Sequence, residues 1–341
     1  MSAVMYASDR ETELWWERSA VPWTGKLFER AILKPGDPEL YRGQRLRDQL
    51  YYRPEGFIGT LSIVRARIFT QVYQQTEGEP AVIRKAKAVA RVLAEMPIPV
   101  VPHQLLMGTP CSVFPGTEVE PEFVTSWMLN EVVVNGKRMT EVDAIPIRTA
   151  NRYRLSDEDK RELKEEIIHY WRDRHHEAVI RKQLARSYPE ALRFWDESEM
   201  FLPITIGLSH TVQEYLAVVN KGLEGLKSEL RRSIDAIDGA NPTSLSDFDR
   251  LSHYEAMIML ADATIGYAER CADAAEAAAR DEQDPERRAE LMEMARICRK
   301  VPARPAESWW EALQSWIFAR VLTYVSDAGA SHSAGRFDQY M

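Results

Sequence analysis

The apolar positions of the chain recur mainly with the three- and four-residue spacing of helices. Pro80 suits the first turn of a helix, and a group of prolines that begins at Pro97 ends it. The apolar residues between these prolines fall on one face: Ile83, Ala86, Ala90 and Leu93. The pattern therefore predicts an amphipathic helix between the two proline positions.

Capping residues mark the start of two helices in the middle of the chain. Ser156 is followed three residues later by Asp159, which predicts the N-terminus of a long charged helix that runs toward Tyr188. Thr211 and Glu214 have the same spacing and predict a second helix with an apolar stripe behind the cap. Both segments are therefore expected to be helical from their first turn.

Three further helices are predicted in the last third of the chain. An alanine-rich pattern covers about 251–280, Asp284 and Pro285 open the next helix, and Ser308 with Glu311 forms a capping box ahead of a strongly apolar helix. The helix behind Pro285 has one apolar face: Leu291, Met294, Ala295 and Cys298. The chain is thus expected to be mainly helical.

Strand signals are few. Residues 132–134 are apolar and precede Asn135-Gly136, a turn signal that favours a hairpin with residues near Met139. The chain contains no internal repeat and no composition typical of a flexible linker. We therefore expect one continuous, mainly helical region.

Composition and charge narrow the function classes. The 341 residues include 44 Lys and Arg against 52 Asp and Glu, a net charge of -8, which disfavours nucleic acid or an anionic membrane as a partner. Charged residues near the N-terminus disfavour a signal peptide, and no apolar run reaches the length of a membrane span. Three scattered cysteines do not make a disulfide framework. A cytoplasmic protein is predicted.

The last residues carry a family resemblance. Residues 335–340, GRFDQY, resemble the glycine-arginine-x-aspartate-glutamine-tyrosine motif of glycyl radical enzymes, the pyruvate formate-lyase-like superfamily. Further segments resemble the family in the same order along the chain: TEGEP and RKAKA within 76–88, MPI and LMG within 96–108, H-x-x-x-x-Y and GLEG within 210–225, and CRKVPARPA with EALQ within 298–314. The match thus extends from Thr76 to Tyr340.

The resemblance implies an α/β fold built on a ten-stranded barrel with helices outside it. It implies that residues 1–341 are the truncated, mainly helical N-terminal part of a single pyruvate formate-lyase-like domain, with the first barrel strand near the C-terminus. The apolar helix through Trp316 and Phe318 has only a short tail behind it, so we expect structure beyond Met341 to cover it.

The resemblance also implies the chemistry. A backbone glycyl radical, installed by an S-adenosylmethionine-dependent activating enzyme, is relayed to a cysteine thiyl that abstracts hydrogen from substrate. Both radical residues lie beyond the GRFDQY motif in the family, so this chain is expected to lack the catalytic cysteine and the glycyl radical loop, to bind no cofactor and to be inactive alone. The implied partners are the activating enzyme, a small organic acid or alcohol substrate and, at full length, a second copy in a homodimer.

The reaction itself stays open among several alternatives. We favour radical C–C cleavage, such as decarboxylation of an arylacetate-like acid. Dehydration of a small diol or amino-acid-like substrate and a formate acetyltransferase reaction are the alternatives within the family. A different class is a non-catalytic helical scaffold that ends naturally at Met341.

Three residues are predicted to bind substrate, namely Ser333, His210 and His332. His210 precedes the expected Thr211 cap and either faces a cavity or fixes its loop, and relatives place a histidine of this segment near substrate. Ser333 is assigned by resemblance, with a solvated loop as the alternative. On an extended strand Ser331 and Ser333 would face one side and His332 the other. A structural role is expected for the motif residues Arg336, Asp338 and Gln339.

Other reactive side chains are predicted to be structural. Cys298 lies on an apolar helix face, and none of Cys111, Cys271 and Cys298 matches the thiyl position of the family, so packing is expected for all three. The helical segment with His169, His175 and His176 is heavily charged and lacks the four-residue spacing of a helical zinc pair. No metal site is predicted.

Overall fold

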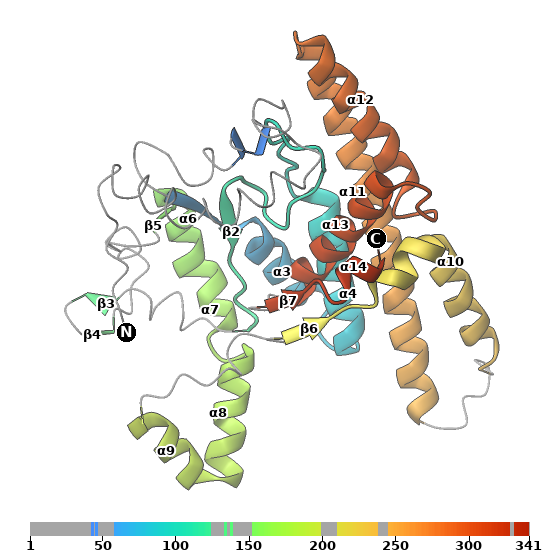
Figure 1. Ribbon diagram of the computed structural model, residues 1–341. Coiled ribbons are helices and arrows are strands. Elements are labelled where there is room, and N and C mark those ends of the chain that lie inside the picture. The colour runs from blue at the N-terminus through green and yellow to red at the C-terminus, as the bar shows by residue number, and fades with distance from the viewer. Residues whose placement is uncertain are drawn as a thin grey trace, which may run out of the picture. The chain divides into compact units, whose positions relative to one another are not determined.

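The computed structural model describes residues 58–123, 152–198, 210–237, 245–327 and 331–340, and short pieces at 42–43, 45–46, 133–134 and 137–138. The chain divides into two units, Met1–Phe57 and Ile58–Met341. The elements described below all belong to the second unit (Figure 1). As predicted, most of its described residues are helical.

The hydrophobic core lies mainly among five helices of this unit, and residues of the segment 163–171 pack into it. The five helices are α3 (Val64–Gln75), α4 (Ala81–Glu95), α11 (Leu245–Asp281), α12 (Pro285–Lys300) and α13 (Trp309–Asp327). α11 packs along both α4 and α12 (Figure 1). Its buried face is mostly small, and small side chains let helix axes approach closely: Ala268, Cys271, Ala272 and Ala275.

The predicted start of α4 and the predicted cap and apolar stripe of α12 are confirmed. Of the stripe predicted for α4, Ala86 and Leu93 are buried, whereas Ile83 and Ala90 are half-buried. Pro80 directly precedes α4, and the Asp284 side chain accepts a hydrogen bond from the N–H of Glu286 at the start of α12. All four residues predicted for the apolar face of α12 are buried: Leu291, Met294, Ala295 and Cys298.

The capping box of α13 is half formed. The Ser308 hydroxyl accepts a hydrogen bond of 3.2 Å from the N–H of Glu311, as predicted. The buried Glu311 carboxylate instead accepts from Lys300 Nζ at 2.7 Å and from the N–H of Glu307 at 2.8 Å. Burial acts to raise the pKa of Glu311, but the hydrogen bonds outweigh it and the pKa is lowered. Glu311 therefore joins the end of α12 to the start of α13.

The prediction of a single charged helix that runs toward Tyr188 is wrong. Ser156 caps α6 (Asp157–Glu162) as predicted, with 3.0 Å from its Oγ to the N–H of Asp159. A π-helical turn and a short helix follow α6, and the helical path ends after Trp171. His175 is extended, and its Nδ1 caps a separate helix. The segment thus comprises α6, a π-helical turn η2 (Leu163–Ile167), α7 (Ile168–Trp171), α8 (His176–Ser187) and α9 (Pro189–Ser198).

The cap predicted at Thr211 is also wrong. Residues His210–Val212 form strand β6, and helix α10 (Tyr215–Asp235) begins only after it, with no side-chain cap at Glu214. The physical reason is that β6 has a strand partner, and the Thr211 hydroxyl bonds to a side chain of that strand.

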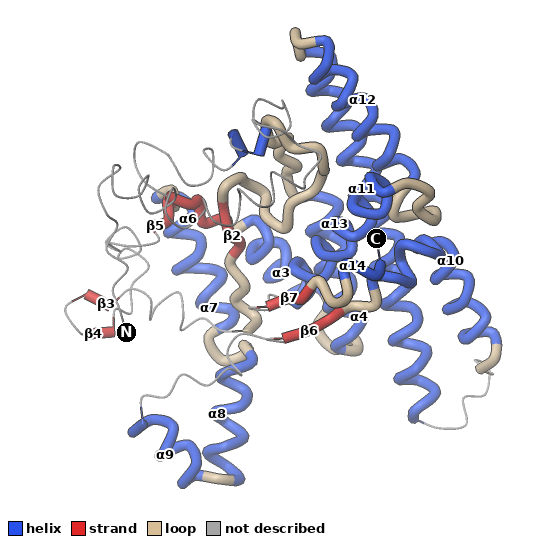
Figure 2. The backbone as a smooth tube through the Cα atoms, viewed as in Figure 1, coloured by secondary structure: helices blue, strands red, loops and turns tan. Residues whose placement is uncertain are grey.

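In the part of the chain that the structure describes, strands form three small groups (Figure 2). β1 (Ile58–Ser62) pairs in parallel with both β2 (Gly116–Glu118) and β5 (Arg152–Arg154). β3 (Val133–Val134) and β4 (Lys137–Arg138) form the predicted hairpin. β6 pairs in parallel with β7 (Ser331–Ser333).

α13, the helix expected to need cover from beyond Met341, is largely covered within the described chain. It packs against α4, α10 and α11, and Phe318, Val321 and Val325 are buried. Trp309, in its first turn, is 55% exposed. The expectation of an uncovered apolar helix therefore holds only at this end. Within the described residues, no helix has the combination of length and apolarity needed to cross a membrane.

Candidate functional site

Strands β6 and β7 bring together two segments that are 121 residues apart in sequence. Their parallel register pairs His210 with Ser331, Thr211 with His332 and Val212 with Ser333. Because alternate positions of a strand share a face, positions 210 and 212 lie on the same face as 331 and 333. The register thus places two of the predicted substrate-binding positions, 210 and 333, on one face and His332 on the other.

The face that carries Ser333 is open. Ser333 is exposed, and its neighbour Val212 on β6 is 61% exposed. The Ser333 Oγ accepts a hydrogen bond of 3.3 Å from the N–H of Gly335, which has a φ of 66°. A hydroxyl that accepts one hydrogen bond keeps its own O–H for another partner. Ser333 can therefore donate to a group on the open face.

The face that carries His332 is covered by α13. The His332 ring is 5% exposed and meets the Tyr324 ring edge to face, with 4.5 Å between centroids. Arg320 Nη1 donates to the His332 carbonyl oxygen at 2.9 Å, and its Nη2 lies 3.2 Å from the Tyr324 hydroxyl. α13 thus fixes both the ring and the backbone of this strand.

Arg336, Asp338 and Gln339 belong to the turn behind β7 and to the short helix α14 (Phe337–Tyr340). All three are exposed, and the Arg336 Nη1 lies 3.4 Å from Gln339 Oε1. Within the described residues neither Arg336 nor Asp338 has an ion pair. Phe337 instead anchors the turn on the rings of Trp316 and Trp309.

A buried charge network that the sequence analysis missed lies at the start of α3. Arg65 is 1% exposed, binds the Glu122 carboxylate through both Nη atoms, and donates from Nε to the Val325 carbonyl oxygen at 3.0 Å. Its own N–H donates to Glu118 Oε2 at 3.1 Å. Glutamates at alternating positions 118, 120 and 122 in a segment with buried apolar neighbours were the available signal. The network joins α3, the segment after β2 and the end of α13.

The third glutamate of this segment, Glu120, is compensated only in part by Arg65. Burial raises the pKa of Glu120 to about 8, Arg65 opposes the rise, and the carboxylates of Glu122 and Glu118 add to it. This shift favours the protonated form of Glu120. Glu120 carries the only raised carboxylate pKa resolved among the described residues.

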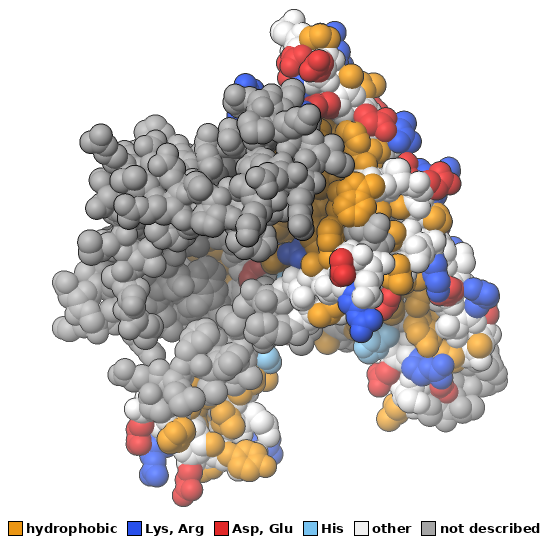
Figure 3. All heavy atoms as spheres, in the orientation of Figure 1, with side chains coloured by type: hydrophobic (Ala, Val, Ile, Leu, Met, Phe, Trp, Pro, Cys, Tyr) orange, Lys and Arg blue, Asp and Glu red, His pale blue; other side chains and the backbone are white. Residues whose placement is uncertain are grey.

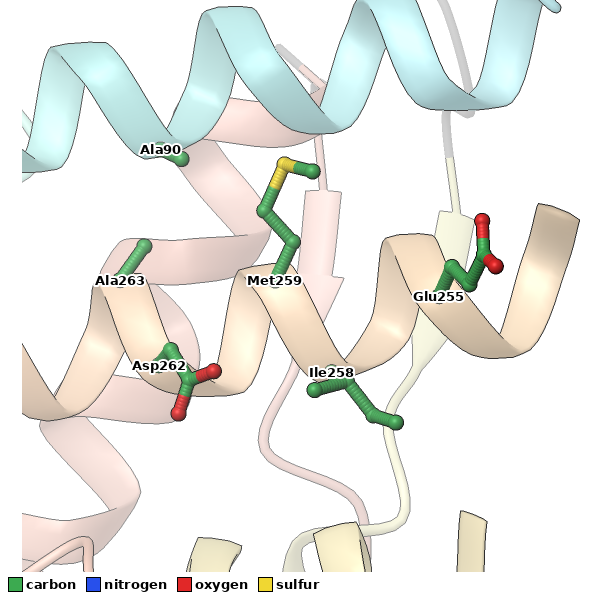
Figure 4. Close-up of a pocket in the computed structure, with 6 residues that line it drawn as sticks. All are labelled: Ala90, Glu255, Ile258, Met259, Asp262 and Ala263. Carbon is green, nitrogen blue, oxygen red and sulfur yellow. The ribbon is translucent and has the colours of Figure 1, made fainter. Parts of the chain in front are cut away.

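An open pocket of about 550 Å³ lies between α4 and α11. Its lining is mostly apolar, and Met259 of α11 points toward the helix that carries Ala90 (Figure 4). Asp262 at its edge is paired with Lys227 of α10. None of the lining residues comes from β6 or β7, and the pocket lacks convergent polar groups.

Lysine, arginine and carboxylate side chains are interspersed on the visible face of the helices (Figure 3).

Comparison with known proteins identifies the family. The family described as Pyruvate formate lyase-like matches residues 29–341. The chain belongs to this family of glycyl radical enzymes.

The relatives of this glycyl radical enzyme chain differ in reaction. Isethionate sulfite-lyase of Bilophila wadsworthia is 30% identical over 316 residues, which are 89% of this chain and 36% of the relative. Indoleacetate decarboxylase of Tractidigestivibacter scatoligenes is 20% identical over 295 residues, 80% of this chain and 33% of the relative. The chain thus spans about a third of the length of the curated relatives it matches.

Solved structures agree with this assignment. A glycyl radical enzyme from Archaeoglobus fulgidus matches with a TM-score of 0.76 and 32% identity, covering 88% of this chain and 36% of that one. A structure on 1,2-propanediol dehydration in Roseburia inulinivorans matches with a TM-score of 0.74 and 32% identity, covering 87% and 33%. The described fold is therefore that of part of a glycyl radical enzyme.

Segments that resemble the glycyl radical enzymes meet one another in space. The N–H groups of Leu223 and Glu224 donate to the carbonyl oxygens of Pro302 and Ala303 at 2.8 and 3.0 Å. Gly222 interrupts α10 with a φ of 67° and a ψ of 165°. A Cβ at this position would lie 2.5 Å from the Ala303 carbonyl oxygen. Only glycine fits where the GLEG segment contacts the CRKVPARPA segment.

A second pair of these segments meets at Gln314. Its amide accepts from the N–H of Met107 and donates to the carbonyl oxygen of Met107, both at 2.8 Å. Gly108 has a φ of 95°, and a Cβ there would lie 3.4 Å from the rings of Phe318 and Tyr267. The LMG and EALQ segments therefore form one buried contact between a loop and α13.

The segment within 76–88 is tied to α3 by Arg84 and to the end of α13 by Lys85. Arg84 Nε donates to Thr76 Oγ1 at 3.2 Å, its Nη2 donates to the Tyr73 carbonyl oxygen at 2.6 Å, and its guanidinium lies over the Tyr73 ring. Lys85 Nζ is 2.5 Å from Asp327 Oδ1 at the end of α13. These motif residues therefore join α4 to α3 and to the end of α13.

The three cysteines are buried and unpaired, as expected for packing residues. Burial raises the pKa of the Cys111 and Cys271 thiols to about 12 and raises that of Cys298 as well. A nucleophilic or radical-relaying cysteine needs access to substrate, which these thiols lack.

The histidines of the charged segment do not form a metal site. His175 is buried as the cap of α8, and burial lowers its pKa. Among the described residues, no group of three His, Cys, Asp or Glu side chains is arranged to hold a metal ion.

Proposed function

We propose that this chain is the N-terminal part of a single pyruvate formate-lyase-like domain whose barrel begins with β6 and β7. The parallel pairing of β6 with β7 carries the proposal. It puts positions 210 and 333 on one open face, while α13 covers the opposite face. In a barrel wrapped by helices, the face away from the helices is the interior. Ser333 and His210 would then face the substrate cavity.

The reaction we propose is elimination from a small hydroxylated substrate. Hydrogen is abstracted from the carbon that bears a hydroxyl, the group on the next carbon leaves as water or sulfite with loss of the hydroxyl proton, and a hydrogen atom returns to the carbon that lost the group. The products are an aldehyde with water from a 1,2-diol, or an aldehyde with sulfite from a hydroxylated sulfonate. The more similar relatives named above carry out such eliminations, at 30% and 32% identity, and the decarboxylase is 20% identical. This ranking replaces our sequence-based preference for decarboxylation.

The residues of this chain would bind and orient the substrate. Ser333 offers an O–H donor that its bond from Gly335 leaves free, and His332 holds a buried ring beside the same strand pair. The catalytic cysteine and the radical glycine would lie in the part of the enzyme beyond this chain. The radical, installed by an S-adenosylmethionine-dependent activating enzyme, would supply hydrogen abstraction, and the full-length enzyme would be a homodimer.

A substrate panel tests this proposal. The full-length protein, activated anaerobically, would be assayed with propane-1,2-diol, glycerol, isethionate and phenylacetate. We expect aldehyde or sulfite release from at least one of the first three and no carbon dioxide from phenylacetate. If phenylacetate were the one substrate turned over, decarboxylation would again be the preferred reaction. The absence of a glycyl radical after activation would instead support the non-catalytic scaffold.

A further inference from the structure

Arg320 of α13 is held in place from several sides. Its Nη1 donates to the His332 carbonyl oxygen at 2.9 Å, and its Nη2 donates to the Tyr324 hydroxyl at 3.2 Å. The guanidinium carbon lies 4.8 Å from the centre of the Trp316 ring and 5.3 Å from that of the Tyr324 ring. Trp316 and Tyr324 are four residues to either side of Arg320, so the three side chains share one face of the helix.

The position of Arg320 depends on aromatic rings and neutral oxygen atoms. Among the described residues, no carboxylate forms an ion pair with it, so its partners are the two rings and the two oxygen acceptors. A guanidinium is planar, so it can stack on rings while its edge donates in two directions, which the ammonium of a lysine cannot do. These contacts indicate that Arg320 serves to hold the carbonyl group of His332.

The bond to this carbonyl oxygen bears directly on Ser333. A peptide group is planar, so holding the oxygen of His332 also fixes the nitrogen of the next residue, which is Ser333. On the other side of Ser333, the N–H of Gly335 donates to its Oγ at 3.3 Å. The chain then returns to α13, where the Phe337 ring meets the Trp316 ring with 5.2 Å between centroids. α13 thus holds the chain on both sides of Ser333.

Arg320 can act on the open face of the strand pair only through the backbone. It belongs to α13, which covers the face of His332, whereas Ser333 lies on the opposite face. We propose that Arg320 is a positioning residue, which sets the direction of the Ser333 hydroxyl through the peptide group between His332 and Ser333. The consequence for substrate rests on the proposed function, whereas the anchoring of β7 does not.

Hydrogen exchange tests the anchoring without any substrate. The full-length protein and Arg320→Met, which keeps the apolar stem, would be compared by mass spectrometry on the peptide that covers 331–333. We expect exchange to be roughly fivefold faster in the variant, the effect of about one hydrogen bond. The matched control is Arg174→Met, since Arg174 also lies over a ring, at 4.7 Å, and donates to the Tyr170 carbonyl oxygen at 2.9 Å. Exchange as slow in Arg320→Met as in this control would overturn the anchoring.

A double-mutant cycle tests whether Arg320 acts through Ser333. In the activated full-length enzyme, Arg320→Met should lower kcat/KM by roughly tenfold, because the hydroxyl is misplaced, while the glycyl radical signal keeps its amplitude. The double variant with Ser333→Ala should be no slower than Ser333→Ala by itself, since the group that Arg320 directs is already absent. Losses that multiply in the double variant would overturn the positioning role.

Arg320→Lys tests whether the bond to the His332 carbonyl is the part that matters. The ammonium keeps one donor for this oxygen but loses the fork and the stacking. Both its exchange rate and its kcat/KM should therefore lie between those of the wild type and of Arg320→Met. Losses in Arg320→Lys as large as those in Arg320→Met would overturn the role of this bond.

The combined results separate this inference from the proposed function. Faster exchange in Arg320→Met, together with wild-type kinetics in Ser333→Ala, would support the anchoring and refute the contact of Ser333 with substrate. Faster exchange and a slow Ser333→Ala, together with wild-type kinetics in Arg320→Met, would support the proposed function and overturn the positioning role of Arg320.

Discussion

Replacement of Gly222 by alanine tests the contact that interrupts α10. The backbone at this residue has a φ of 67° and a ψ of 165°, a region that is essentially restricted to glycine. The added Cβ would lie 2.5 Å from the carbonyl oxygen of Ala303 and 2.6 Å from the carbonyl carbon of Arg304. These are backbone atoms, so rotation of a side chain cannot relieve the overlap.

The expected loss of stability has two parts. Holding a non-glycine residue in this region costs about 1–3 kcal/mol. Moving the 302–304 backbone away would weaken the bonds from Leu223 to Pro302 and from Glu224 to Ala303, at roughly 1 kcal/mol each. We therefore expect Gly222→Ala to lower the free energy of unfolding by about 3–5 kcal/mol, a large part of the about 5–15 kcal/mol of a typical protein.

Urea unfolding followed by circular dichroism at 222 nm measures this loss. Gly266→Ala is the matched control, because it lies inside α11 and a Cβ there has no atom within 4 Å. The control should stabilise the helix by up to about 1 kcal/mol. Equal midpoints for Gly222→Ala and the wild type would refute the proposed contact between α10 and the 301–305 loop.

Two further predictions concern buried polar groups. Gln314→Leu leaves the buried N–H and C=O of Met107 without partners and should cost about 2–4 kcal/mol in the same assay, whereas the exposed control Gln183→Leu should change stability by less than about 0.5 kcal/mol. Equal losses in both variants would contradict this assignment. Burial, with the Glu122 carboxylate adding to it, raises the pKa of Glu120 to about 8, so the folded state holds an extra proton between the ordinary value of 4.5 and pH 8. Wild-type stability should therefore fall as pH rises through that window and Glu120→Gln should abolish the fall, whereas parallel pH profiles would show that Glu120 titrates normally.

The helices with clear caps and apolar stripes could be predicted from the sequence. α4 follows Pro80, α12 begins at Pro285, and the four residues of the α12 stripe are buried as expected. These features are local, since the cap and the stripe lie within one element. The hairpin of β3 and β4 could be predicted for the same reason, from its Asn135-Gly136 turn.

Elements that depend on distant partners could not be predicted. β6 has three residues and no alternation that distinguishes it from a helix cap, and its strand state comes from pairing with β7. The break before α8 depends on His175, whose capping role is not one of the usual signals. Gly222 was noticed as part of a motif, but its φ and its contact with Ala303 depend on the loop at 301–305.

In the candidate site too, local features could be predicted and features that depend on distant partners could not. Ser333 and His332 were expected on opposite faces of a strand, and the strand and their different exposure agree with this. That position 210 shares the face of Ser333 follows only from the register of two strands far apart in sequence. The hydrogen bond between Thr211 and His332 was hidden because Thr211 was interpreted as a helix cap.

The kinetics of Ser333→Ala in the activated full-length enzyme test the central claim most directly. We expect kcat/KM for the elimination substrate to fall by roughly tenfold or more, because one hydrogen bond to substrate is lost, while the glycyl radical signal keeps its amplitude. Ser326→Ala, at the end of α13, is the matched control and should change neither quantity. Wild-type kinetics for Ser333→Ala would contradict the claim that the open face of β6 and β7 meets the substrate.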